Sequence, residues 1–247
     1  MSLSATSLSL ASRLTGITAT LEAGEVTAIC GPNGAGKSTL LACLAGLLEV
    51  DPGAVSLGGA SLAVLPPRER ARAIGYLPQS PEIAWDVTVE VLVSLGRIPW
   101  PGAPAREAAD AIEQALAAMD LVPLRLRPVS RLSGGERARA LMARVLATGP
   151  RWLLADEPLA NLDLAHAAVL MARLRDQAAQ GAGVVLVLHD LAQAMNHAGR
   201  VLVLHEGRLV ADGPPELALA EDVIARCWGV EARWLGEAGA RALAVRA

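Results

Sequence analysis

Aromatic residues and lysine are scarce in this chain of 247 residues. Phenylalanine is absent, tyrosine occurs once, and only 2% of the residues are aromatic. Lysine occurs at a single position, Lys37, while arginine supplies the other positive side chains. The ammonium group of lysine is a compact, strongly hydrated charge that arginine does not reproduce. A lone lysine in such a chain therefore indicates a position whose chemistry requires it.

Long apolar runs are also missing, although 53% of the residues are hydrophobic. No stretch approaches the roughly 18 to 20 apolar residues of a membrane helix, and residues 1–12 lack the basic start of a signal peptide. The net charge of −3 gives no general attraction to nucleic acid. Cys30, Cys43 and Cys227 lack metal-ligand spacing and are predicted to be buried free thiols. We therefore expect a cytoplasmic protein without a nucleic-acid partner.

Short apolar runs alternate with helical patterns, which is typical of an α/β protein with a mainly parallel sheet covered on both faces. Strands are predicted at 26–30, 152–155, 184–188 and 201–204, and helices at 39–48, 164–179 and 191–197. Hairpins are predicted at 55–62 and 201–211. Between 80 and 149 the pattern is mainly helical, with predicted helices near 108–119 and 134–147, which indicates a helical insertion.

A glycine-rich segment follows the first buried strand. Gly31-Pro32-Asn33-Gly34-Ala35-Gly36-Lys37-Ser38 fits the pattern G-x-x-x-x-G-K-[ST] between a strand and a helix. Its backbone N–H groups and the helix N-terminus are suited to phosphate oxygens. Lys37 is expected to reach the β- and γ-phosphates, and the Ser38 hydroxyl to hold Mg²⁺. A chance glycine-rich turn is the alternative, and the complete pattern in this context favours a nucleoside triphosphate site.

Two acidic residues end the apolar strand that begins at Trp152. Ligands of parallel sheets bind at the carboxyl ends of the strands. Asp156 is suited to holding Mg²⁺, and Glu157 to acting as the general base on an attacking water. An acidic pair at a strand end also occurs as a helix cap. The phosphate loop upstream favours the catalytic interpretation.

The segment Leu132-Ser133-Gly134-Gly135-Glu136 has the spacing of a capping box, with Ser133 and Glu136 as its partners. A cap alone does not need two consecutive glycines, which weaken a helix. Glycines at this place would let a second phosphate approach the exposed N–H groups. A second phosphate-binding helix start, far from the first, indicates a site that another chain completes.

These motifs resemble those of ABC-transporter ATPases along nearly the whole chain. Lys37 lies in the Walker A loop, Ser133-Gly134-Gly135 in the signature and Asp156-Glu157 in the Walker B strand. Gln79 matches the Q-loop glutamine, Asn161-Leu162-Asp163 the D-loop, and His189 the switch histidine. The resemblance implies a P-loop NTPase (RecA-like) core with a mainly parallel sheet, an N-terminal antiparallel β subdomain and a helical subdomain.

The resemblance also implies one ABC ATPase domain over residues 1–247. Its catalytic core would comprise 1–79 and 150–215, the helical subdomain with the signature 80–149, and a C-terminal appendix 216–247. Two copies would form a head-to-tail homodimer around two ATP molecules with Mg²⁺. Membrane permease subunits would bind the helical block, on the cytoplasmic face of the inner membrane. A periplasmic or lipoprotein substrate-binding protein would take part indirectly.

The same resemblance assigns residue roles. Lys37, Glu157 and His189 would be catalytic. Gln79 would connect the γ-phosphate and the metal to the helical block. The residues expected to contact nucleotide are Gly31, Pro32, Asn33, Gly34, Ala35, Gly36, Lys37, Ser38, Thr39, Gln79, Ser133, Gly134, Gly135 and Asp163. Those expected near the metal are Ser38, Gln79 and Asp156.

Two features depart from the family pattern. Residues 1–30 hold no aromatic side chain to stack on adenine, a role that Arg13 could take through its guanidinium plane. Position 138 is alanine, where relatives often carry glutamine. His166, His197 and His205 are interpreted as structural histidines.

The segments 91–99, 205–215 and 229–232 resemble importers for ferric siderophores, haem and cobalamin. Zinc and manganese importers share parts of these segments, and Gly96-Arg97 also fits an ordinary turn. The sequence favours a metal-chelate cargo, with another small solute as the alternative.

Three classes of function compete. A transporter motor predicts permease partners and one ABC unit per chain. A soluble ABC ATPase would usually need a coiled-coil insertion, a tandem second unit or a basic face, and none is visible in the sequence. A non-hydrolytic scaffold would have lost Lys37, Glu157 or His189, and all three are present. The sequence therefore favours the ATP-hydrolysing subunit of an ABC importer.

Overall fold

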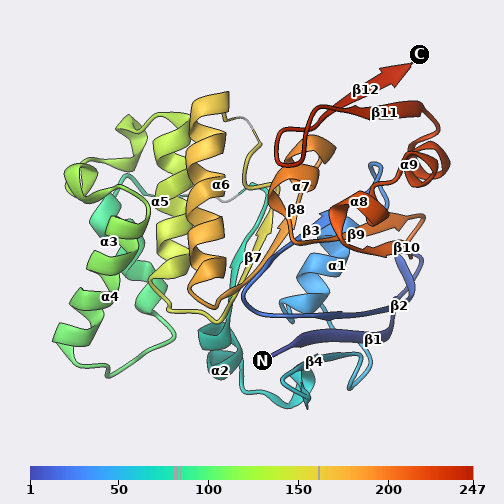
Figure 1. Ribbon diagram of the computed structural model, residues 1–247. Coiled ribbons are helices and arrows are strands. Elements are labelled where there is room, and N and C mark those ends of the chain that lie inside the picture. The colour runs from blue at the N-terminus through green and yellow to red at the C-terminus, as the bar shows by residue number, and fades with distance from the viewer. Residues whose placement is uncertain (81–82, 84, 161, 247) are drawn as a thin grey trace.

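The computed structural model describes residues 1–80, 83, 85–160 and 162–246. Its centre is a mainly parallel sheet in the order β10–β9–β3–β8–β7–β6 (Figure 1). The strands are β3 (Val26–Cys30), β6 (Ile74–Leu77), β7 (Trp152–Asp156), β8 (Gly183–Val187), β9 (Arg200–His205) and β10 (Arg208–Gly213). Strand β10 pairs with β9 in the antiparallel sense, and the neighbours from β9 to β6 pair in parallel.

A smaller antiparallel sheet covers one face of the central sheet, with helix α1 (Lys37–Leu44) between them (Figure 1). Its order is β2–β1–β4–β5, with strands β1 (Leu3–Leu10), β2 (Leu14–Leu21), β4 (Val55–Leu57) and β5 (Ala60–Ser61). Side chains of β3 alternate between two cores: Ile29 faces the antiparallel sheet, whereas Ala28 and Cys30 face the opposite helices. The predicted N-terminal antiparallel β subdomain is thus confirmed.

Helices cover the other face and extend beyond the edge of the sheet, where α3 to α6 lie together (Figure 1). The helices are α2 (Pro67–Ala73), α3 (Val89–Ser94), α4 (Ala105–Ala118), α5 (Gly134–Leu146), α6 (Leu164–Ala179), α7 (Leu191–His197), α8 (Pro215–Ala218) and α9 (Glu221–Trp228). Short 3₁₀ turns occupy Leu62–Val64, Leu95–Arg97, Val122–Leu124 and Val129–Arg131. The predicted helical insertion is present between β6 and β7.

The α/β fold class is confirmed, and several boundaries differ by a few residues. Helix α1 was predicted at 39–48, but it ends at Leu44 because the chain folds back onto the helix, with Leu47 N donating to Ala42 O at 2.9 Å. The hairpin predicted at 55–62 stops at Ser61, since Leu62 begins a 3₁₀ turn capped by the Ser61 side chain.

The segment after 214 is more structured than its sequence indicates. Strands β11 (Glu231–Leu235) and β12 (Ala242–Arg246) form a hairpin that projects from the molecule near the C-terminus (Figure 1). Asn196 on α7 holds it through two hydrogen bonds with the backbone of Arg241, both 2.8 Å long. The Trp234 indole N–H donates to Leu219 O at 2.8 Å. This segment therefore packs on the core.

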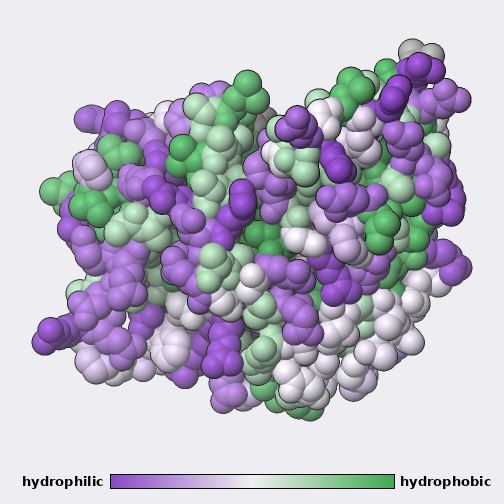
Figure 2. Space-filling view, in the orientation of Figure 1, coloured by the Kyte–Doolittle hydropathy of each residue, from purple (hydrophilic) through white to green (hydrophobic). Residues whose placement is uncertain are grey.

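On the face drawn in Figure 2, hydrophilic and hydrophobic residues are interspersed. Among the described residues, no helix is both long and apolar enough to cross a membrane. Cys30, Cys43 and Cys227 are free and buried, as predicted. Burial raises the pKa of the Cys30 thiol to about 12.

Candidate nucleotide-binding site

The phosphate loop joins β3 to α1 and ends at Gly36. Gly36 has a φ of 97°, and a Cβ there would lie 2.9 Å from Arg13 O, so the loop requires glycine at this position. Lys37 is only 6% exposed. Its ammonium group donates to Gly31 O and Pro32 O, both at 2.9 Å. Burial lowers the pKa of Lys37, and the charge of Glu157 opposes that shift.

Asp156, the last residue of β7, faces the start of α1. The Ser38 hydroxyl donates to Asp156 Oδ1 at 3.1 Å, and Asp156 is 4% exposed. Burial raises the pKa of Asp156, while the hydrogen bond from Ser38 acts in the opposite direction. A buried carboxylate beside a hydroxyl is an oxygen donor set of the kind that Mg²⁺ prefers, and a cation would offset the cost of burying the charge. The two residues fit a magnesium site that substrate phosphates complete.

Glu157 follows Asp156 in a left-handed conformation, with a φ of 51°. Such a conformation costs a non-glycine residue about 1–2 kcal/mol and is often found at functional sites. The carboxylate accepts a hydrogen bond from Gln79 Nε2 at 2.8 Å, and its other oxygen is hydrogen-bonded to His189 Nε2. The structure thus brings together three residues from the ends of β6, β7 and β8.

These elements enclose a cleft of about 800 Å³ above the phosphate loop. Its described lining consists of Ser12, Arg13, Asn33, Gly34, Ala35, Gly36, Lys37, Ser38, Thr39, Gln79, Glu157 and His189. None of these is Phe, Tyr or Trp. Arg13, which the sequence analysis named as a replacement for the adenine-stacking residue, lines the cleft. No sequence pattern indicated Ser12, which reaches the cleft because the β1–β2 turn lies beside the loop.

The turn between β9 and β10 supports the phosphate loop from behind. Gly207 N donates to Ala35 O at 3.2 Å, and Thr15 N donates to Gly207 O at 2.8 Å. The backbone of Gly207 therefore links the β1–β2 turn to the loop. The sequence predicts the His205-Glu206-Gly207-Arg208 turn only as part of a hairpin. Its contact with the phosphate loop arises because β9 lies next to β3 in the sheet, which the sequence alone does not show.

The signature turn lies apart from this cleft. Ser133 Oγ accepts from Glu136 N, and Glu136 accepts from Ser133 N at 2.8 Å, so the predicted capping box is confirmed. Ser133, Gly135 and Asp163 are not among the described residues that line the cleft. Gly134 lines a neighbouring cavity of about 250 Å³ together with Gln79 and Glu157. Asn161 of the predicted D-loop lies outside the described residues.

Two features together define a P-loop nucleotide-binding protein. One strand runs into a glycine-rich loop with a buried lysine, and a nearby strand ends in two acidic residues. Residues 14–160 match the family model described as ABC transporter. The chain belongs to the ABC transporter family and is an ATP-binding ATPase of that family.

Similar proteins include two named Hemin import ATP-binding protein HmuV. The protein from Rhodococcus jostii (strain RHA1) is 42% identical over 207 residues, which cover 83% of this chain and 71% of the relative. The protein from Myxococcus xanthus (strain DK1622) is 43% identical over 232 residues, which cover 89% of this chain and 86% of the relative.

Solved structures agree on the fold. CbiO1 from Clostridium perfringens, part of the ABC transporter complex cbiONQ, has a TM-score of 0.81 and 28% identity and covers 91% of this chain and 92% of its own. An ABC transporter in an inward-facing conformation, described as of the metal-chelate type, has a TM-score of 0.83 and 25% identity, with 99% and 96% covered. One is a component of an ABC transporter complex and the other an ABC transporter, which agrees with the family assignment.

Proposed function

We propose that this ATPase is the motor subunit of an importer for a metal-chelate cargo, with haem as the first candidate. The observation that carries the proposal is a cleft lined by Lys37, Glu157 and His189, with Asp156 bonded to its Ser38, in a chain whose relatives are named for hemin import. The segments 91–99 and 205–215, which resemble metal-chelate importers, support the same cargo class.

The phosphate loop would hold the triphosphate. The ammonium group of Lys37 now bonds two carbonyls of its own loop, and it would exchange them for β- and γ-phosphate oxygens. Ser38 and Asp156 would hold Mg²⁺, which when bound neutralises charge on the phosphate oxygens. Because Asp156 already bonds the Ser38 hydroxyl, the two ligands are in place before the substrate arrives.

Glu157 would act as the general base on the attacking water. Gln79 and His189 both hydrogen-bond its carboxylate, which keeps the side chain at the cleft. When ATP binds, His189 would turn to the γ-phosphate and Gln79 to the phosphate and metal. Glu157 would then be free to accept a proton from water. Gln79 would pass the change to residues 80–149.

A second copy of the chain would complete the site. The capping box at Ser133 and the N-terminus of α5 provide N–H groups suited to phosphate, yet Ser133 and Gly135 do not line the chain's own cleft. In a head-to-tail dimer they would face the nucleotide of the partner, and Asp163 would approach the same nucleotide.

The permease would dock in a groove between the core and the helical block. This groove has a volume of about 480 Å³ and is lined by residues of α2, β6 and α5 and by Leu95, Gly96, Ile98 and Pro99. Leu47 and Ile98 are 58% and 72% exposed at its sides. Exposed apolar side chains around a groove favour an apolar helix as the partner. The ATPase would thus lie at the cytoplasmic face of the membrane, with the substrate-binding protein on the other side.

The Glu157→Gln substitution tests the motor. It removes the base but keeps the shape, so ATP binding should persist while turnover falls by about 10²- to 10⁴-fold. ATP should then trap the variant as a dimer, detectable by size-exclusion chromatography with light scattering. Normal turnover in this variant would reject Glu157 as the base.

The cargo is tested in cells whose only copy carries Glu157→Gln. Uptake of labelled haem, ferric siderophore and cobalamin would be measured side by side, with cells that carry the unsubstituted parent chain as the control. Loss of haem uptake alone supports the first candidate. Loss of one of the others moves the cargo within the class, and persistence of all three would reject a metal-chelate importer in favour of another solute such as zinc or manganese.

A further inference from the structure

We propose that His166 is a positioning residue that joins the D-loop to the signature turn of its own chain, so that both approach the partner's nucleotide as one unit. This inference rests on the proposed head-to-tail dimer. His166 lies in the first turn of α6, three residues after Asp163, and is not among the described residues that line the ATP cleft.

The first observation is the contact of His166 with the signature. Gly135 lies in the first turn of α5, and the His166 imidazole occupies the space that a side chain would fill there. A Cβ placed on Gly135 would overlap the ring and lie 2.7 Å from His166 Cβ. The glycine is therefore required for packing within the chain, whatever it allows a phosphate to do. A close approach of this kind fixes the distance between α5 and α6.

The second observation is the bond of His166 with the D-loop. Asp163 Oδ1 accepts from His166 N at 2.8 Å and is hydrogen-bonded to His166 Nδ1 at 2.7 Å. Asp163 thereby caps α6, and these hydrogen bonds lower the pKa of its carboxyl group. One imidazole thus bonds the D-loop through its edge and packs on the signature through its ring.

The arrangement has a mechanical consequence. Asp163 is 64% exposed and Ser133 is also exposed, so neither is held by a core of its own. Through His166, a displacement of α5 moves Asp163 as well. When a partner's nucleotide draws in the signature turn, the D-loop follows without a separate conformational step.

A double-mutant cycle tests the inference on the full-length chain. His166→Gly removes the imidazole hydrogen bond to Asp163 and the whole side chain beside Gly135, including its Cβ, and should lower kcat by about 5- to 10-fold, the effect of losing a hydrogen bond worth about 1 kcal/mol or slightly more. His166→Gln retains a donor toward Asp163 and should recover most of that loss. Gly135→Ala should lower kcat by more than about 10-fold, because overpacking displaces α6. Gly213→Ala, whose methyl group meets nothing within 4 Å, is the matched control.

The double variant tests whether the His166 side chain is the reason that position 135 requires glycine. With the whole side chain at 166 removed, Gly135→Ala should cost no more than about 2-fold beyond His166→Gly alone. An equal cost of Gly135→Ala in both backgrounds would overturn the inference, because the glycine would then serve the nucleotide or the backbone. A harmless Gly135→Ala would overturn it too.

Two further measurements distinguish a failure of the His166–Gly135 contact from a failure of the proposed function. ADP affinity should stay within about 2-fold for every variant, since the chain's own phosphate loop is untouched and the proposed dimer requires ATP. The thermal midpoint should show the same non-additivity as kcat, which detects the steric overlap even if the proposed dimer is wrong. Failure of Glu157→Gln to trap a dimer would reject the proposed function, whereas additive midpoints would reject the His166–Gly135 contact.

Discussion

The guanidinium group of Arg72 lies 4.2 Å from the ring centre of Trp100, across the boundary between the core and the helical block. Arg72 belongs to α2, and its Nε donates to Pro99 O at 2.9 Å. On the other side, the Trp100 indole N–H donates to Thr148 O at 2.9 Å. Arg97 lies 5.2 Å from the same ring. These contacts link the segment that contains Gly96 and Arg97 to α2 of the core and to Thr148 after α5, beside the proposed permease groove.

Arg72→Gln is expected to destabilise the chain by about 1 kcal/mol, because it removes a cation–π contact and a hydrogen bond. For a chain of this length, that lowers the thermal midpoint by roughly 2–4 °C. Trp100→Leu should cost more, since it also leaves Thr148 O without its donor. Differential scanning calorimetry measures both.

Arg68→Gln, at an exposed position on the same helix, is the matched control and should change stability by less than about 0.5 kcal/mol. Equal midpoints for the variants at 68 and 72 would show that the stack contributes no stability.

Arg13 is expected to contribute to base binding. It lines the ATP cleft, whose described residues include no Phe, Tyr or Trp. Arg13→Ala should weaken ATP binding by about 3- to 5-fold, whereas Arg13→Tyr should restore or improve it, because either a guanidinium plane or a ring stacks on adenine. Isothermal titration calorimetry of the Glu157→Gln chain with ATP and GTP would measure the effect.

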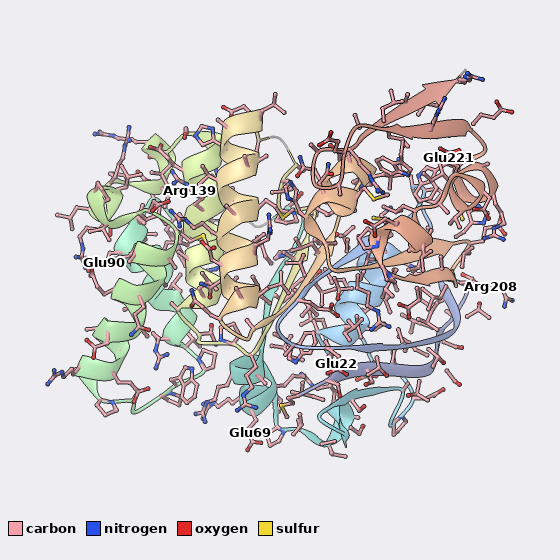
Figure 3. All side chains as sticks on the ribbon, in the orientation of Figure 1. Glu22, Glu69, Glu90, Arg139, Arg208 and Glu221 are labelled. Atoms are coloured by element: carbon pink, nitrogen blue, oxygen red, sulfur yellow. The ribbon has the colours of Figure 1, made fainter. Side chains whose placement is uncertain are left out.

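Arg208→Ala is a suitable control for Arg13→Ala. Arg208 is exposed on β10, at the outer edge of the molecule in Figure 3, and should leave ATP affinity unchanged. A weaker binding of triphosphate but not of adenosine in Arg13→Ala would assign Arg13 to the phosphates and contradict the stacking role.

Much of the site could be predicted because its residues belong to contiguous motifs. The run from Gly31 to Ser38 encodes both the turn and the helix start, and Asp156-Glu157 ends an apolar strand. Strand ends in a parallel sheet meet at one edge, so the meeting of Gln79, Glu157 and His189 follows from the fold class.

The parts that were missed depend on packing between distant segments. No local pattern indicates that Gly207 supports Ala35 or that Gly135 faces His166, since each pair meets only after the sheet order and helix positions are set. The hairpin of β11 and β12 was also missed. Strand β11 exposes the charged Glu231 and Arg233, and Trp234 and Asn196 hold the hairpin on the core.

Asp156→Asn is expected to stabilise the chain at neutral pH while abolishing efficient hydrolysis. Burial raises the pKa of Asp156, so the folded state binds this proton more tightly than the unfolded state. Between the ordinary carboxyl pKa and the raised one, stability therefore falls as pH rises. The amide carries no charge and avoids this cost, but loss of a Mg²⁺ ligand should lower turnover by about 10²-fold or more.

Chemical denaturation at several pH values measures the effect. The stability gained by Asp156→Asn should be largest above the raised pKa and shrink as the pH falls through it, because Asp156 of the parent chain then becomes protonated. Ser38→Ala, which removes the hydroxyl donor, should lack this gain. A constant gain at every pH would show that Asp156 does not ionise differently in the folded state.

The backbone of Glu157 leads to a different prediction about stability. At a φ of 51°, any residue with a Cβ pays about 1–2 kcal/mol, whereas glycine adopts this conformation freely. Both Glu157→Ala and Glu157→Gly lose the general base and should be inactive. The glycine variant should nevertheless be the more stable of the two by about 1 kcal/mol, which raises the thermal midpoint by roughly 2–4 °C.

The same pair of substitutions at Glu22 provides the control (Figure 3). Glu22 is exposed and has an ordinary φ, so the alanine variant should be the more stable there by about 0.4–1 kcal/mol, because glycine gains more freedom on unfolding. A reversed order at Glu157 relative to Glu22 shows that the folded chain holds the catalytic carboxylate in a strained turn. If alanine is the more stable variant at both positions, residue 157 leaves the left-handed conformation once no carboxylate is there to bond Gln79 and His189. Those two bonds, and not the end of β7, would then impose the strain.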